Sequence, residues 1–119
     1  MIFTTNLYES VVFAQACARL GCVHYMLNAT FTVSEVISQL ESFNPHLIFT
    51  MSHVPQAEEN NNKEVKWTPT KDVLSQAFAK IKSDSDFRPN SAKIVYTIVS
   101  RNLSTSEVPS HWTDFSQLV

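Results

Sequence analysis

Residues Ser10–Thr50 carry the pattern that decides the fold, and they read SVVFAQACARLGCVHYMLNATFTVSEVISQLESFNPHLIFT. Segments with helical apolar spacing alternate with short, nearly apolar segments in the order helix, strand, helix, strand. This alternation predicts parallel strands joined by crossover helices. Right-handed crossovers then give a three-layer, doubly wound α/β fold, with a mostly parallel sheet of about four strands flanked by helices.

The residues between these segments set the expected boundaries. Gly21 is the only glycine of the chain and supplies the left-handed conformation that ends a helix. Thr32 and Glu35 fit a capping box at the start of the second helix, and Pro45 ends that helix. The expected elements are a strand end at 1–4, helices at 7–20 and 33–43, and strands at 22–27 and 46–51. The first helix is expected to bury a broad apolar stripe made of Val11, Val12, Phe13, Ala14 and Ala18.

The second half continues the pattern with longer polar connections. Residues 52–66 are polar and are expected to form a surface loop. A helix is expected from Pro69, with Thr68 as its cap, because proline suits the first helical turn. Its expected buried face consists of Val73, Leu74, Ala77, Phe78 and Ile81. A β-branched strand at 93–99 and a short closing helix at 110–118 complete the chain. Residues 1–119 are therefore interpreted as one αβ domain.

Composition narrows the functional classes. Apolar residues make up 44% and charged residues 17%, with a net charge of −2. This balance predicts a globular protein and gives no reason to expect binding to nucleic acid or to an anionic membrane. No apolar run approaches the roughly 20 residues of a membrane span, and the amino terminus lacks the pattern of a secretory signal. We expect a cytoplasmic protein.

Several kinds of chemistry are excluded by what the sequence lacks. A phosphate-binding loop or a dinucleotide-binding G-x-G-x-x-G needs several glycines, and the chain has one. The positions that would carry the acidic residues of a receiver domain hold Thr4, Thr5 and Thr50. These threonines argue against a phosphoryl-accepting receiver, whereas a receiver-like regulator without phosphorylation remains an alternative.

The cysteines and histidines form no recognisable metal or catalytic pattern. Cys17 and Cys22 lie five residues apart without a second cysteine pair, and we interpret them as buried thiols that serve as small apolar residues. His24 would share a sheet face with Cys22, away from Cys17. His46 and His53 leave a metal pair as a weaker alternative. We therefore predict no metal site and no catalytic residue.

The run ACARLGCVH at Ala16–His24 closely resembles the A-C-A-R-[IL]-G-A-V-H segment of acetyl-CoA synthetases. These enzymes belong to the adenylate-forming (AMP-binding) acyl-CoA ligases. The similar motifs follow in the same order and at similar spacing over nearly the full length of the chain. Propionyl- and acetoacetyl-CoA synthetases share many of these motifs. Further similar segments are FTVSE at 31–35, PHLIFT at 45–50, PTK at 69–71, KIVYTIVS at 93–100 and HWTDF at 111–115.

The resemblance implies a two-step ligase reaction. ATP with Mg²⁺ and a short carboxylate give an acyl-adenylate and pyrophosphate, and the thiol of coenzyme A then displaces AMP. The family's phosphate loop, ribose-binding aspartate and catalytic lysine would all follow Val119. We therefore expect a partial or truncated amino-terminal domain that is inactive as an isolated chain, located in the cytoplasm or, for a full-length relative, in an organelle.

The resemblance also implies candidate coenzyme A contacts. An R-x-G-R segment of the family contacts the coenzyme's phosphates, and alignment on Pro69 places Lys63 and Lys66 at its two arginine positions. Lysine keeps the charge but lacks the bidentate fork of arginine. Ala29 and Thr30 stand at the two glycines of the family's F-G-G-F turn, where they add Cβ atoms on the side of the coenzyme.

Two functional hypotheses follow from these observations. The first is the acyl-CoA synthetase segment, whose partners would be coenzyme A, the remainder of a ligase domain, or a second copy bound through exposed apolar surface. The second is a non-catalytic αβ interaction or regulatory domain, which the loss of both glycines favours. Neither predicts an intrinsic cofactor within these residues.

Overall fold

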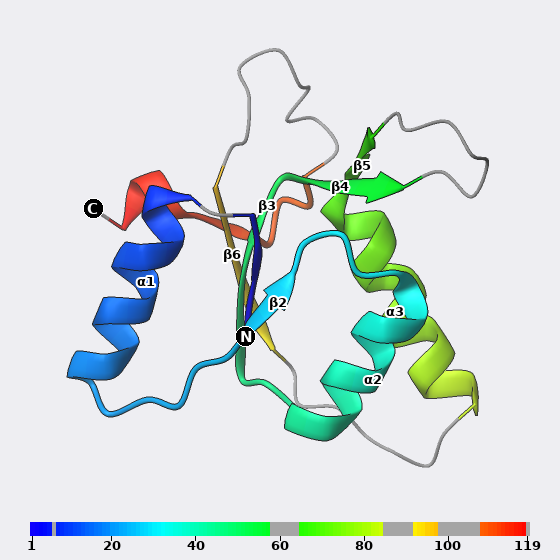
Figure 1. Cartoon of the computed structure of the whole chain (residues 1–119), viewed down its shortest axis with the longest axis horizontal. Helices are drawn as coiled ribbons and strands as arrows, with labels where there is room; N and C mark the ends of the chain where they lie inside the picture. Colours follow the sequence, from blue (N-terminus) through cyan, green and yellow to red (C-terminus); the bar gives the residue numbers. More distant parts are fainter. Residues whose placement is uncertain (6, 58–64, 85–91, 98–107, 119) are drawn as a thin grey trace.

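The computed structural model of the chain describes residues 1–5, 7–57, 65–84, 92–97 and 108–118. These residues form an α/β fold with a five-stranded parallel sheet at its centre. Helices cover both faces of the sheet (Figure 1). The expected α/β class and parallel sheet are confirmed, with five strands in place of about four.

The described elements follow one another in this order: β1 (Ile2–Thr4), α1 (Tyr8–Arg19), β2 (Met26–Asn28), α2 (Val33–Phe43), β3 (Leu47–Met51), β4 (His53–Ala57), β5 (Val65–Pro69), α3 (Thr70–Asp84), β6 (Lys93–Thr97), β7 (Thr113–Asp114) and the 3-10 helix η2 (Phe115–Gln117). The sheet has the order β2-β1-β3-β6-β7, and β4 and β5 form a separate antiparallel hairpin. In Figure 1, α1 and η2 lie on one face of the sheet and α2 and α3 on the other.

The strand order reverses direction between β1 and β3. The chain crosses from β1 outward to β2 through α1, then returns past β1 to β3 through α2. Phe3 pairs with Leu27 on one side and with Thr50 on the other. In open α/β sheets, ligands bind beyond the carboxyl ends of the strands at such a reversal. This edge is therefore the first place to look for a site.

The larger core fills the space between the sheet and the two helices α2 and α3. Leu40 of α2 and Ile81 of α3 are each 1% exposed and belong to the same apolar cluster as Ile48 of the sheet, which is 0% exposed. We call this cluster the α2–α3 core, and its buried members are Met1, Phe3, Leu27, Ala29, Val36, Leu40, Ile48, Val54, Val73, Leu74, Ala77, Ile81 and Trp112.

A smaller core lies under α1. Ile2, Phe49 and Val95 form this cluster, which we call the α1 core. Phe13 of α1 stacks on Phe49 with ring centroids 4.7 Å apart, and Phe115 of η2 meets Phe49 edge-on at 5.4 Å. Alternation along the strands places this second set of side chains on the opposite face from the α2–α3 core.

The face that α1 buries differs from the expected stripe. Val11 is 58% exposed and Ala18 is also exposed, whereas Ser10 is buried and Phe13 and Ala14 pack on the sheet. The expectation that Val11 and Ala18 are buried was wrong. An apolar count along a short helix does not by itself identify the side that meets a sheet, and here the aromatic ring of Phe13 does so.

The caps of α2 agree with the sequence. The Thr32 side chain accepts a hydrogen bond from the Glu35 backbone N–H, and the Glu35 carboxylate accepts one from the Thr32 backbone N–H at 2.7 Å. Asn44 ends the helix in the left-handed conformation, with φ of 42°. The predicted capping box and the predicted stop before Pro45 are both confirmed.

Three other boundaries were wrong. The second strand begins at Met26, not at position 22, so Cys22–His24 lie outside it. The expected loop at 52–66 contains β4 and the start of β5, because Val54 is fully buried in the α2–α3 core. Thr68 lies in β5 rather than capping a helix; α3 begins at Thr70, whose hydroxyl donates to the Met51 carbonyl at 2.6 Å.

The closing segment was also predicted too simply. Instead of one helix at 110–118, a short strand pairs in parallel with β6 through Val95↔Thr113 and Tyr96↔Asp114. The Asp114 carboxylate then accepts from the Ser116 N–H at 2.9 Å and caps η2. A strand of two residues leaves no periodicity in the sequence from which to predict it.

Candidate functional site

The turn after β2 lies at the carboxyl edge of the sheet and contains two of the predicted coenzyme contacts. The Asn28 side-chain oxygen accepts from the Thr30 N–H at 3.0 Å and from the Thr30 hydroxyl at 2.8 Å. The Phe31 N–H donates to the Asn28 carbonyl at 3.1 Å and closes the turn. Asparagine often organises a turn through such local bonds.

The two predicted positions of this turn have different surroundings. Ala29 is 1% exposed and belongs to the α2–α3 core, so its methyl group points inward. Thr30 is exposed. Only Thr30 therefore places a Cβ on the surface that a coenzyme would approach.

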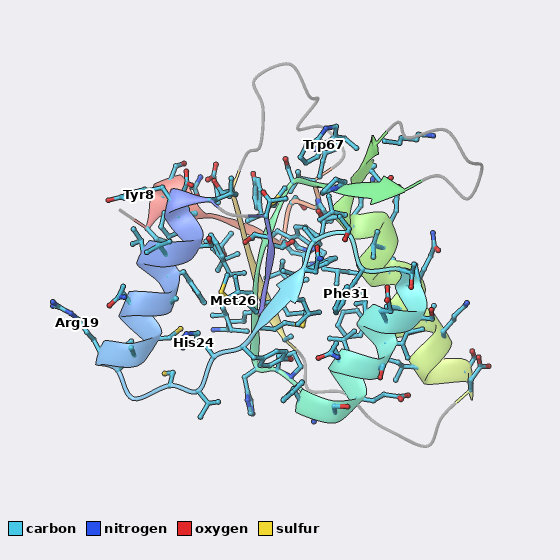
Figure 2. The ribbon with its side chains drawn as sticks, viewed as in Figure 1. Tyr8, Arg19, His24, Met26, Phe31 and Trp67 are labelled. Atoms are coloured by element: carbon cyan, nitrogen blue, oxygen red, sulfur yellow. The ribbon has the colours of Figure 1, made fainter. Side chains whose placement is uncertain are left out.

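The predicted lysines are partly described. Lys66 is exposed on β5, opposite Gln56 of β4, and Lys63 lies outside the described residues. Figure 1 shows the β4–β5 hairpin at the end of the sheet that the carboxyl ends of β2 and β3 also reach. Trp67 beside Lys66 is 40% exposed and lies above β4, towards the centre of the view in Figure 2. The hairpin thus presents a cation and an aromatic surface at this edge.

A buried hydroxyl lies at the same edge. The Thr4 hydroxyl, at the carboxyl end of β1, has no hydrogen-bond partner although Thr4 is only 4% exposed. Its neighbour Thr5 donates both its N–H and its hydroxyl toward the Met51 sulfur, at 3.1 and 3.4 Å. Thr4 lies on the α1 face, two residues after Ile2 on the same strand.

These residues fit the implied ligands only in part. Lys66 supplies charge for a phosphate, and Thr30 supplies a hydroxyl. The inward-facing Ala29 does not obstruct a ligand, whereas the Thr30 side chain occupies surface that glycine would leave open. For ATP with Mg²⁺ the described residues do not fit, because they contain no glycine-rich loop and no group of three His, Cys, Asp or Glu that could hold a metal ion.

The opposite edge of the sheet holds a pocket that the sequence did not predict. Its volume is about 530 Å³, within the range of small-molecule sites. It lies between the end of α1 and the amino ends of β1, β2 and β3. We call it the amino-edge pocket, and its lining residues are Met1, Phe13, Ala16, Cys17, Leu20, Cys22, Val23, His24, Tyr25, Phe43, Asn44, Pro45, His46 and Leu47. Figure 2 shows His24 between the end of α1 and the sheet.

The end of α1 forms one wall of this pocket. Gly21 adopts a φ of 71°, the left-handed conformation that glycine accepts without strain. The Gly21 N–H donates to the Ala18 carbonyl at 3.2 Å, and the Cys22 N–H donates to the Cys17 carbonyl at 2.9 Å. This pair of bonds is the Schellman motif. The predicted helix stop at Gly21 is confirmed.

Both cysteines line the amino-edge pocket. Cys17 is half-buried and Cys22 is exposed, so the interpretation of both as buried thiols was wrong. Burial raises the pKa of the Cys17 thiol, and the neighbouring charge of the Cys22 thiolate raises it further. The pocket therefore contains two chemically different thiols, which the sequence placed apart because it assigned Cys22 to a strand.

The opposite wall contains a tyrosine with an unpartnered hydroxyl. The Tyr25 ring stacks on Phe43 with centroids 4.1 Å apart, and its buried hydroxyl has no hydrogen-bond partner. Loss of solvent around the hydroxyl raises the pKa of Tyr25 to about 12. The Tyr25 phenol therefore keeps its proton to a higher pH than an exposed tyrosine does.

The described histidines lie in different surroundings. His53 is 3% exposed and its Nδ1 lies 3.1 Å from the Ser52 hydroxyl. His46 and His24 are exposed at the amino-edge pocket. No described helix is both long enough and apolar enough to cross a membrane.

Comparison with known proteins does not assign the chain to a family. The chain matches none of the family models against which it was scanned, and no curated protein matches it. The fold, the two edges of the sheet and the sequence resemblance are the features that bear on function.

Proposed function

We propose that this chain is the scaffold part of the amino-terminal domain of an AMP-forming short-chain acyl-CoA synthetase, and that its carboxyl edge faces coenzyme A. The observation that carries the proposal is the turn Asn28–Phe31, which lies at the carboxyl end of β2 beside the reversal of strand order. Ligands of open α/β sheets bind at this position. The resemblance of Ala16–His24 and of the later segments supports the same family.

The described residues would act by binding. The ammonium group of Lys66 would attract a coenzyme phosphate as a point charge, with Lys63 as its predicted companion. The Thr30 hydroxyl, held by Asn28, would face the same ligand. Acyl-adenylate chemistry would come from ATP bound by residues that this chain does not contain, so we propose no turnover by the 119 residues.

Two measurements test the proposal. The purified chain, given acetate, ATP, Mg²⁺ and coenzyme A, should release no pyrophosphate above background; robust turnover would contradict the proposed inactivity. Calorimetric titration with coenzyme A should show weak, salt-sensitive binding that is lost in the Lys63→Ala, Lys66→Ala double variant. Lys93→Ala is the matched control, because Lys93 is an exposed cation at the amino end of β6.

A glycine variant sharpens the test. Thr30→Gly restores the open turn of the family and should tighten coenzyme A binding, whereas Ala29→Gly should change it less because the Ala29 methyl group is buried. Equal effects at the two positions, or binding that ignores the lysines, would argue against the proposed coenzyme surface.

The exposed apolar side chains favour a second candidate, a non-catalytic interaction domain. Tyr8 is 80% exposed, Leu20 is 78% exposed and Val23 is 97% exposed, all on α1 or directly after it. Leu20 and Val23 lie close together at the end of α1, and Tyr8 lies at its start, so exposed apolar side chains occur at both ends of this helix, and larger exposed apolar areas mark contact surfaces. This candidate expects no coenzyme A binding and a sedimentation coefficient that rises with concentration. A strictly monomeric chain that binds coenzyme A would exclude it.

A further inference from the structure

We propose that Cys17 and Cys22 form a disulfide-exchange site, in which a low-molecular-weight disulfide of the glutathione class oxidises the two thiols to an intramolecular bond across the end of α1. The site lies on the wall of the amino-edge pocket, at the edge of the sheet opposite the proposed coenzyme surface. It does not depend on the proposed ligase function.

Backbone geometry brings the two residues together. The hydrogen bond from the Cys22 N–H to the Cys17 carbonyl is 2.9 Å long. Standard covalent dimensions then limit the separation of the two Cα atoms to less than about 6.8 Å. This limit coincides with the upper end of the Cα separations found in disulfides, about 4.4–6.8 Å.

The side chains are also suitably directed. In a Schellman motif, the residue at the Cys17 position and the residue at the Cys22 position commonly contact each other through their side chains. Here both side chains line the same pocket, so both are directed toward its space. The effect of the Cys22 charge on the Cys17 pKa is consistent with this proximity.

The exposure of the thiols sets the order of the two steps. Exposed Cys22 reacts first, because an external disulfide can reach it and half-buried Cys17 is less accessible. The Cys22 thiolate attacks one sulfur of the external disulfide, forms a mixed disulfide and releases one thiol. The Cys17 thiolate then attacks the Cys22 sulfur and releases the second thiol. The two protein thiols are oxidised, and the external disulfide is reduced to two thiols.

A tryptic map of the folded chain tests the proposal directly. Arg19 lies between the two cysteines, so trypsin separates them into the peptides Met1–Arg19 and Leu20–Lys63. After treatment with glutathione disulfide and alkylation of remaining thiols, we expect the two peptides to remain linked within a monomer until a reductant is added. The intact chain should lose the mass of two hydrogen atoms and should retain no glutathione.

Single variants separate the steps. Cys17→Ser should hold a stable glutathione adduct at Cys22, and Cys22→Ser should acquire its adduct several-fold more slowly. An adduct that persists on the unmutated chain, or linkage only between two chains, would overturn the proposal. Faster adduct formation in Cys22→Ser than in Cys17→Ser would overturn the proposed order.

The role of the fold is tested by unfolding it. The effective concentration of one thiol toward the other, obtained by equilibration with glutathione, should be about 10-fold above the roughly millimolar value of a short flexible linker. It should fall to the linker value in concentrated urea. Equal values in the folded and unfolded chain would show that sequence proximity, and not the Schellman motif, brings the thiols together.

Discussion

The two faces of the sheet differ in how completely helices bury their apolar side chains. On the α2–α3 face, both helices bury a continuous stripe, and Val36, Ala77 and Ile48 are all fully buried. On the α1 face, α1 meets the sheet mainly through Phe13 and Ala14 beside the short η2, while Val11 on α1 is 58% exposed. The α2–α3 face is therefore packed as a domain interior is, whereas the α1 face is only partly covered.

The ends of the helices show the same difference. α2 begins with a complete capping box at Thr32 and Glu35, whereas the N-cap of α1, Leu7, makes no side-chain hydrogen bond. A helix with fewer caps and less buried surface opens locally at lower free energy. We therefore expect α1 to be the less protected layer, which also suits a face that would meet a partner.

The largest expected effect comes from truncating the α2–α3 core. Leu40→Ala should lower the free energy of unfolding by about 2–5 kcal/mol, because it leaves a cavity around a side chain that is 1% exposed. Val11→Ala on α1 is the control and should change it by less than about 1 kcal/mol. Chemical denaturation measures both. Similar losses at the two positions would show that the faces are equally packed.

A cap deletion has the next largest effect. Thr32→Ala removes the hydroxyl that accepts from the Glu35 N–H and should cost about 1 kcal/mol of stability. Ser38→Ala, at an exposed position within the same helix, is the matched control and should stay within about 0.5 kcal/mol of the parent chain. If Ser38→Ala is as destabilising as Thr32→Ala, loss of the capping box does not explain the lower stability of Thr32→Ala.

A hydroxyl deletion on the α1 face should act in the opposite direction. Thr4→Val keeps the shape of a buried side chain and removes a hydroxyl without a partner. We expect a gain of about 0.5–1 kcal/mol, because the buried hydroxyl loses its bonds to water and makes no other. Thr50→Val is the control and should be destabilising, since the Thr50 hydroxyl donates to the Phe3 carbonyl at 2.8 Å. A loss of stability in Thr4→Val would indicate a partner or ligand for that hydroxyl.

The better-packed face was also the better predicted from sequence. Thr32, Glu35 and Pro45 gave correct boundaries for α2 because caps and proline act through neighbouring residues. Four of the five residues expected to form the buried face of α3 are buried, namely Val73, Leu74, Ala77 and Ile81. Local rules were sufficient where the helix met a complete apolar surface.

The other face required information that neighbouring residues do not hold. Val11 resembles a core residue in sequence, but its exposure depends on which side of α1 meets Phe49. The hairpin of β4 and β5 was missed because its stability depends on burying Val54 in a distant core. At the proposed coenzyme surface, the sequence placed Ala29 and Thr30 at one turn but could not show that only Thr30 is exposed.

The amino-edge pocket was missed for a related reason. Cys22 was assigned to a strand, although the strand begins at Met26. The spacing of Cys17, Gly21 and Cys22 does predict their proximity. A glycine directly after a helix predicts a Schellman motif, in which the residue after the glycine contacts the residue four positions before the glycine.

The smallest expected effect lies at the boundary between the two faces, where Tyr25 stacks on Phe43 of α2 and lines the pocket under α1. Burial raises the pKa of Tyr25 to about 12, whereas an unfolded tyrosine titrates near pH ~10. Below pH ~10 both states are protonated, and the contribution to stability is complete. Between about pH 10 and 12 the unfolded chain loses the proton first, so stability falls as pH rises.

The Tyr25→Phe variant isolates this contribution. It keeps the ring against Phe43 and removes a hydroxyl that has no partner, so stability at neutral pH should be unchanged or slightly higher. Burial and the charge of Asp114 also raise the pKa of Tyr96, and that contribution is common to both proteins. The difference in midpoint of denaturation between parent and variant should therefore widen only above pH ~10. A constant difference across this range would mean that solvent reaches the Tyr25 hydroxyl, and that the wall between the two faces is open rather than packed.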